Sequence, residues 1–203
     1  MRYSIVLIGF LLTFLPLHTQ NVDIRLLRAI HTSAPLSTDH YEQFLSNTYP
    51  IITLGAPITM VLAGYTLHDD KLLQNALELS SATVLNLGFT ALLKFSANRQ
   101  RPYVTYPDIQ AKSLENSPSF PSYHTSAAFN TASTLSLMYP KWYVIVPSYL
   151  WAGSVGYSRM YLGVHYPSDV LCGALLGIGS AWLKHEIGKW YREKSTIKHG
   201  KYE

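Results

Sequence analysis

The fold is decided by residues 121–183, which read PSYHTSAAFNTASTLSLMYPKWYVIVPSYLWAGSVGYSRMYLGVHYPSDVLCGALLGIGSAWL. The Asp, Glu, Lys and Arg side chains in this stretch are Lys141, Arg159 and Asp169 alone. About a quarter of the residues of an average soluble domain are charged, so this stretch is too poor in charge for a surface in water. A chain of 203 residues has too little mass to bury it entirely. We therefore expect lipid to cover this half of the protein.

Working outward, charge-free runs of helical length occur at 51–67, 79–93, 125–140, 142–158 and 170–183. Each run is shorter than the roughly 20 apolar residues of a typical membrane span, and the mean hydropathy is only +0.07. Together they predict an all-α, membrane-embedded bundle of five or six short spans. Small residues allow close helix contacts, and the last run contains Gly173, Ala174, Gly177 and Gly179. Buried helices of a soluble all-α domain are the alternative.

The two ends of the chain suggest three parts. The apolar run Ile5–Leu17 follows Arg2 and lacks a clear cleavage site, so residues 1–20 are read as a signal peptide or as a first transmembrane helix. Residues 21–183 form the helical domain, in which 21–47 is expected to hold one or two short amphipathic helices at the outer surface. Residues 184–203 form a basic tail.

Charge placement orients the bundle. The tail holds six Lys and Arg residues, and helix alternation puts nine such residues on its side against four on the other, once three site candidates are set aside. Because Lys and Arg favour the cytoplasmic side, we expect the tail to be cytoplasmic. The basic residues form no long run elsewhere, so nucleic acid is not an expected partner despite the net charge of +4. The single cysteine, Cys172, closes no intrachain disulfide and forms no cysteine zinc site.

Three clusters of chemically active residues fall on the side opposite the tail. The first is Lys94 with Arg101-Pro102, where Lys94, Asn98 and Arg101 would share a helix face. The second is Pro121-Ser122-Tyr123-His124, at a helix start where Ser122 would act as the cap and free amides would seat a phosphate. The third is Arg159, His165 and Asp169, with Asp169 in a first helical turn and reaching back to His165.

Each cluster alone has an ordinary structural interpretation: snorkelling cations, a helix cap, a structural ion pair. Together they supply three cations, two histidines, one carboxylate and helix-start amides. A phosphoryl-transfer site needs cations for the phosphoryl oxygens, a nucleophile, an acid for the leaving group and a group that orients the base. No carboxylate cluster suited to magnesium is present in the sequence, so we expect chemistry without a metal and without a cofactor.

The three clusters resemble the signature motifs of the phosphatidic acid phosphatase type 2 family, which is related to bacterial acid phosphatases and vanadium haloperoxidases. Order and internal spacing match over residues 94–169, and 161–177 is more similar to the membrane lipid-phosphatase branch. Tyr123 departs from the usual glycine. Either it is strained by a positive φ, or its ring turns away or contacts the substrate.

The resemblance implies a role for each position. His165 would attack phosphorus and form a phosphohistidine, held by Asp169, and His124 would protonate the leaving oxygen and then activate water. The phosphate-binding group would comprise Lys94, Arg101, Ser122, Tyr123 and Arg159. A neutral His165 and a protonated His124 predict a bell-shaped pH profile.

The leading hypothesis is a phosphatase in a bacterial inner membrane, with its active site facing the periplasm. Its substrate would be a lipid phosphate or diphosphate such as undecaprenyl diphosphate, phosphatidate, phosphatidylglycerol phosphate or the phosphates of lipid A. The sequence ranks neither these lipids nor the oligomeric state. An exported soluble acid phosphatase of broad specificity is the main alternative. A vanadate-dependent haloperoxidase and a membrane protein with a relic site come after it.

Overall fold

The computed structural model describes residues 19–32, 34 and 36–199, and within these residues every regular element is a helix. The elements are α2 (Thr19–Ile30), α3 (Asp39–Leu67), α4 (Asp70–Ala97), α5 (Pro102–Thr105), α6 (Tyr123–Met138), α7 (Trp142–Tyr161) and α8 (Pro167–His199). The predicted signal peptide or first helix at 1–20 lies almost wholly outside the described residues.

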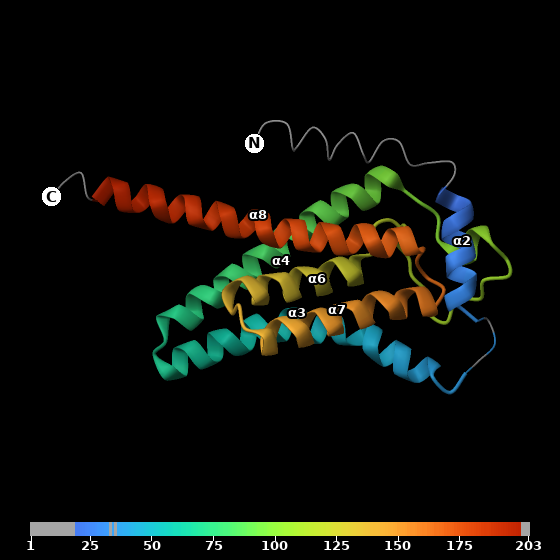
Figure 1. Cartoon of the computed structure of the whole chain (residues 1–203), viewed down its shortest axis with the longest axis horizontal. Helices are drawn as coiled ribbons and strands as arrows, with labels where there is room; N and C mark the ends of the chain where they lie inside the picture. Colours follow the sequence, from blue (N-terminus) through green and yellow to red (C-terminus); the bar gives the residue numbers. More distant parts are fainter. Residues whose placement is uncertain (1–18, 33, 35, 200–203) are drawn as a thin grey trace.

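Five long helices, α3, α4, α6, α7 and α8, form a bundle (Figure 1). Helix α6 is at its centre and contacts the other four. The short helix α2 runs crosswise over one end, where it contacts α7 and α8. The turns α3–α4 and α6–α7 lie at the opposite end, on the same side as the C-terminal part of α8 (Figure 1).

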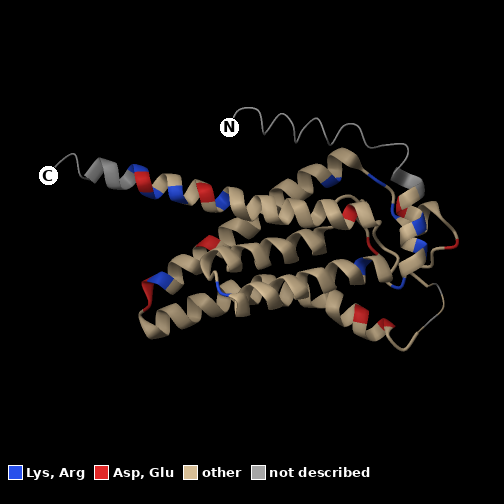
Figure 2. Cartoon of the chain, viewed as in Figure 1, with Lys and Arg blue, Asp and Glu red and all other residues tan. Residues whose placement is uncertain are grey.

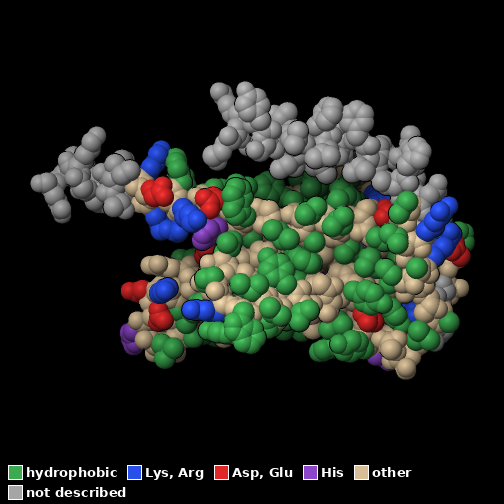
Figure 3. All heavy atoms as spheres, viewed as in Figure 1, with side chains coloured by type: hydrophobic (Ala, Val, Ile, Leu, Met, Phe, Trp, Pro, Cys, Tyr) green, Lys and Arg blue, Asp and Glu red, His purple; other side chains and the backbone are tan. Residues whose placement is uncertain are grey.

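The outside of the bundle is apolar and much of its inside is polar. Large apolar side chains are exposed along the helices, for example Leu150 at 67% and Leu171 at 61%, and they cover the visible face in Figure 3. In the centre, buried Asn86 accepts hydrogen bonds from Ser126 (2.7 Å) and Ser180 (3.0 Å). Charged residues gather toward the two ends of the bundle (Figure 2). This distribution is the reverse of that in a soluble domain and fits a bundle surrounded by lipid.

Two helices, α3 and the one beginning at Asp70, are long and apolar enough to cross a membrane by length and composition. Helices α3, α4 and α8 contain 29, 28 and 33 residues, so they exceed the runs read from the sequence. In α4 and α8 the sequence runs stop at charged residues, whereas the helices continue through them and a charge of each is paired with the other; in α3 the run begins after Pro50, which the helix includes. Glu78 within α4, for example, accepts a hydrogen bond of 2.7 Å from Lys184 of α8.

Helices α6 and α8 pack backbone to backbone. A Cβ atom on Gly173 would lie 2.7 Å from the carbonyl oxygen of Ser122, and one on Gly177 would overlap the carbonyl oxygen of Ser126. These two glycines therefore serve the close approach expected from the sequence. The other two small residues do not, because Gly179 has open space beside it and Ala174 lines an outer groove.

Two sequence boundaries differ from the structure. Residues 39–47, expected to lie in short surface helices, form the first turns of α3, while α2 accounts for the surface helix near residue 21. Helix α8 continues without a break through residue 184. The division of the chain into a domain and a tail at that point stays a prediction.

Candidate active site

All three sequence clusters converge at the end of the bundle that α2 crosses (Figure 1). The site is built from the end of α4, the connection 98–122, the start of α6, the end of α7 and the connection into α8. Its end of the bundle is opposite the basic C-terminal part of α8, as helix alternation predicts.

The residues of the first cluster are brought together by a different backbone conformation from the one predicted. Helix α4 ends at Ala97, and Asn98 adopts the left-handed conformation with φ 42°, so Lys94, Asn98 and Arg101 do not share a helix face. Arg101 is extended immediately before Pro102, which begins α5. Its guanidinium donates to the carbonyl oxygens of Ser117 (2.8 Å) and Val164 (2.9 Å). The Lys94 ammonium donates to the carbonyl oxygen of Pro118.

His165 lies between α7 and α8 and is 1% exposed. Arg101 Nη1 lies 3.3 Å from its Nε2. A guanidinium only donates hydrogen bonds, so Nε2 must present its lone pair and Nδ1 must carry the proton of the neutral ring. Nδ1 lies 3.5 Å from Asp169 Oδ2. Burial lowers the pKa of His165 to about 4, against the opposing attraction of the Asp169 carboxylate, so the ring is neutral at physiological pH.

Asp169 is in the first turn of α8 and is fully buried. Its Oδ1 accepts a hydrogen bond from Arg99 Nη1 at 2.7 Å. Its Oδ2 accepts from the Ser119 hydroxyl at 2.5 Å and from the Tyr166 backbone N–H at 3.0 Å. Three donors besides His165 therefore fix the orientation of this carboxylate.

Arg159 projects from the end of α7 and is 2% exposed. It donates to the Ser46 hydroxyl of α3 at 2.6 Å and pairs with the Glu115 carboxylate. Its Nε has no hydrogen-bond partner among the described residues. Arg159, Glu115 and His124 all line a polar cavity of about 280 Å³.

Glu115 lies between two of the cations, since its other oxygen is 3.8 Å from Arg101. Burial acts to raise the pKa of Glu115, but the charges of Arg159 and Arg101 outweigh burial and hold it below its ordinary value. The site therefore holds a carboxylate of its own beside the cations.

The second cluster starts α6. Ser122 occupies the N-cap position, but its hydroxyl accepts from Thr125 Oγ1 (2.9 Å) rather than from the backbone, so the predicted side-chain cap is absent. Tyr123 is helical and does not have a positive φ, which removes the interpretation of backbone strain. Its ring turns to Tyr49 of α3 in an edge-to-face contact at 5.7 Å. Tyr49 also packs on the His124 ring, at 4.1 Å between centroids.

Several residues of the site were missed by sequence reasoning. Arg99 was counted only as a loop charge, although it lies inside the Lys94–Arg101 segment. Ser119 and Glu115 belong to a long connection whose polar composition predicted function but gave no position. Asp23 binds Arg99 at 2.9 Å from α2, far away in sequence. No signal in the sequence indicates that pairing.

The fold and the site together define a membrane-embedded helical bundle with a cluster of buried cations and two histidines at one end. Residues 75–193 match the PAP2 superfamily. The chain belongs to this family, as the resemblance of its motifs predicted.

Known proteins agree with this assignment. The chain is 39% identical over 68 residues to a protein named lipid A 4'-phosphatase from Bacteroides thetaiotaomicron, a match that covers 34% of this chain and 30% of that protein. The chain thus spans about a third of the length of that curated relative. The crystal structure of Aquifex aeolicus LpxE superposes with a TM-score of 0.69 at 26% identity, covering 81% of this chain and 95% of that one.

A second crystal structure shares the fold. It is a transmembrane PAP2-type phosphatidylglycerolphosphate phosphatase from Bacillus subtilis, with a TM-score of 0.73 at 23% identity over 93% of this chain and 97% of that one. Together with the apolar exterior, these structures place this chain among the all-α membrane bundles.

Proposed function

We propose that this protein is a metal-independent phosphatase that hydrolyses a lipid-linked phosphate or diphosphate through a phosphohistidine intermediate. The observation that carries the proposal is the arrangement of His165, whose Nε2 faces Arg101 while its Nδ1 faces Asp169. The imidazole is neutral, and its lone pair is directed at the Arg101 guanidinium. It is therefore arranged to attack an anion that binds to this cation.

In the first step, His165 Nε2 attacks phosphorus in line and forms a P–N bond. The bond from phosphorus to the lipid oxygen breaks, and His124 donates a proton to that oxygen. Asp169 stabilises the positive charge that develops on the His165 ring. The long Nδ1 to Oδ2 distance of 3.5 Å would shorten as this charge develops, because such contacts often tighten only in the reacting complex.

In the second step, His124 takes a proton from water, and the resulting hydroxide attacks phosphorus. The P–N bond breaks, phosphate is released and His165 regains its lone pair. Lys94, Arg101 and Arg159 would neutralise the phosphoryl oxygens through both steps. The free N–H groups at the start of α6, at Tyr123 and His124, would add donors to the same oxygens.

A lipid substrate is supported by the setting of the site. The site lies at the end of a bundle with an apolar exterior, where a lipid head group would be presented. The names of the relatives refer to a lipid A phosphatase and a phosphatidylglycerolphosphate phosphatase. The basic end of α8 lies opposite, which supports a bacterial inner-membrane protein with its site facing the periplasm.

The test is phosphate release by detergent-purified protein in EDTA, with long-chain lipid phosphates and diphosphates compared with a soluble phosphomonoester. We expect the lipids to be hydrolysed faster and His165→Ala to abolish turnover. Preference for the soluble ester would instead favour an exported acid phosphatase of broad specificity. Loss of activity in EDTA that zinc or magnesium restores would refute the metal-independent mechanism.

A further inference from the structure

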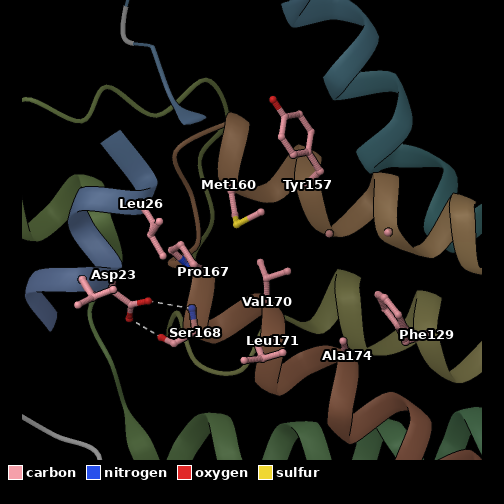
Figure 4. Close-up of a pocket in the computed structure, with 13 residues that line it drawn as sticks. Asp23, Leu26, Phe129, Tyr157, Met160, Pro167, Ser168, Val170, Leu171 and Ala174 are labelled. Carbon is pink, nitrogen blue, oxygen red and sulfur yellow. Dashed lines mark hydrogen bonds between the residues drawn. The ribbon is translucent and has the colours of Figure 1, made fainter. Parts of the chain in front are cut away.

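Asp23 is a buried carboxylate on α2, a helix that lies outside the region matched to the family. Its Oδ1 accepts a hydrogen bond of 2.9 Å from the backbone N–H of Ser168. Its Oδ2 accepts from the Ser168 hydroxyl and, at 2.9 Å, from Arg99 Nη2. Figure 4 shows Asp23 reaching from α2 to Ser168 at the start of α8, at one end of an apolar groove.

Arg99 links Asp23 to the candidate active site. Its Nη1 donates to Asp169 Oδ1 and to the Ser168 hydroxyl, each at 2.7 Å. Its guanidinium also lies 3.9 Å from the centre of the Tyr166 ring. One guanidinium therefore bridges Asp23 on α2 and Asp169 on α8, and Asp169 is the partner of His165.

The bridge has two physical effects on Asp169. Arg99 is permanently charged, and Asp23 balances that charge, so the pull of Arg99 on Asp169 is weaker than it would be alone. Asp23 also binds a backbone N–H in the first turn of α8, where helical N–H groups lack partners. The turn that carries Asp169 is thereby fixed in place from outside the bundle.

We propose that Asp23 is a positioning residue of the active site, supplied by α2, which acts through Arg99 and Ser168 to set the orientation and charge of Asp169 toward His165. The inference rests on the proposed function and extends it to a part of the chain outside the family motifs. It makes α2 part of the catalytic machinery rather than a surface attachment.

The chain offers a matched control for loosening of α2. Arg28 of α2 pairs with Asp108 at 2.8 Å, with both side chains about half exposed. This pair ties the same helix to the same 98–122 connection at a position away from His165 and Asp169. Asp108→Ala should weaken the attachment of α2 without altering the charge beside Asp169.

The first experiment compares lipid-phosphate turnover in Asp23→Ala, Asp23→Asn and Asp108→Ala, each checked for folding by thermal unfolding in detergent. We expect Asp23→Ala to lower kcat about tenfold to a hundredfold with KM nearly unchanged, since displacement of a catalytic group has effects of this size. Asp108→Ala should keep its kcat within about twofold, as expected of an exposed pair. An equal loss in both, or a loss confined to KM, would overturn the proposal.

A pH profile of turnover distinguishes an effect of the Asp23 charge on His165 from a purely structural effect of Asp23 on the position of α2. The titratable and charged groups that face His165 are Arg101, Glu115, His124, Arg159 and Asp169. Removing the negative charge of Asp23 should move the acidic limb of the profile to lower pH, and Arg99→Gln should move it to higher pH, each by about half a unit. Shifts in the same direction would contradict the proposed role.

A third measurement does not depend on turnover. Histidine-selective ¹⁵N labelling in detergent follows the ring of His165 against pH, with the signal assigned by its loss in His165→Gln. We expect the His165 titration to move in Asp23→Ala and to stay in place in Asp108→Ala. If the wild type hydrolyses no lipid phosphate, the proposed function fails, while this titration still decides whether Asp23 is coupled to His165. An unchanged titration overturns the inference.

Discussion

The two sides of His165 differ in how completely their polar groups are satisfied. On the carboxylate side, Asp169 accepts from Arg99, Ser119 and the backbone of Tyr166 in addition to facing His165. On the cation side, Arg159 leaves its Nε without a partner among the described residues and pairs with Glu115, which is 24% exposed. The carboxylate itself is fixed by its donors, although the His165 Nδ1 that faces it has no close hydrogen-bond partner among the described residues, and the cation side has unused capacity for an anion.

This difference suggests a separate task for each side of His165 in the proposed reaction. A carboxylate with several donors keeps its position, so its contact with the His165 Nδ1 can tighten during a reaction with little movement of the carboxylate itself. Buried cations that lack acceptors gain most when an oxyanion enters. In the proposed mechanism, the carboxylate side therefore acts on the nucleophile, and the cation side acts on the substrate.

The largest expected effect comes from breaking the carboxylate side. Asp169→Asn should lower kcat by about 10³-fold to 10⁴-fold, as loss of the orienting carboxylate does in a serine protease triad. The amide neither fixes the tautomer of His165 nor stabilises its positive charge. Single-turnover phosphate release is the measurement, and Ser119→Ala, which removes one of the three donors, is the graded control. A loss of less than tenfold in Asp169→Asn would remove Asp169 from the mechanism.

The next effect is on pH dependence. The pKa of His165 is lowered to about 4 by burial, so the ring has its lone pair above that pH and loses it below. We expect kcat/KM to fall about tenfold per pH unit below pH 4 and the acidic limb to be absent between pH 5 and 6. The assay needs protein that stays folded at pH 3.5, which circular dichroism checks. A limb near pH 6.5 would mean that the nucleophile titrates as an exposed histidine.

A smaller effect is expected from a substitution on the cation side, and it tests whether Glu115 competes with phosphate for the cations. Glu115→Gln removes a carboxylate beside Arg159 and Arg101 while keeping its shape. We expect inorganic phosphate to inhibit this variant about threefold to tenfold more strongly, because phosphate no longer competes with an internal anion. Inhibition constants for phosphate give the answer, and Glu78→Gln, an acidic residue paired with Lys184 at the other end of the bundle, is the control. Weaker inhibition would make Glu115 a support for Arg159.

The smallest effect concerns Tyr123, whose ring neighbours are Tyr49 and His124. Its ring packs on Tyr49 and its backbone is helical, so Tyr123→Gly should cost little through strain. We expect the ratio of rates on different lipid phosphates to change by about twofold to fivefold while turnover persists, since a change in packing beside a candidate catalytic residue such as His124 alters discrimination between substrates at this level. Loss of activity on every substrate would show that the ring is needed for the fold of the site.

The sequence predicts which residues come together at the candidate site more completely than it predicts the lengths of the surrounding helices. Arg159 and Asp169 were selected from the scarcity of charge, because a charge in an apolar stretch is itself a signal. Lys94, Arg101, His124 and His165 were selected from their spacing and from their positions at predicted helix ends. The lengths of α4 and α8 were underestimated, because hydropathy cannot show that Glu78 is neutralised by Lys184. The partnership of Asp23 with Arg99 depends on where α2 packs, and no local pattern records such a contact.

The position of Tyr123 shows a different limit. From the sequence, a missing glycine indicated either strain or a need for space, and the residue alone could not decide between them. The structure decides because the backbone at 123 belongs to α6 and the ring finds Tyr49 on α3. Spacing within a motif thus selects candidate reacting groups, while tertiary packing determines what an unusual neighbour contacts.

Helix α8 has a practical consequence for imaging this protein. It contains 33 residues, so it is about 50 Å long at 1.5 Å per residue, and Asp169 lies in its first turn while its far end extends beyond the bundle (Figure 1). A rigid helical scaffold joined in register to α8 would turn as one body with the residue that orients His165. Such a fusion would give a protein of 22.8 kDa enough visible mass for electron microscopy, and the scaffold's orientation would report directly on the active site.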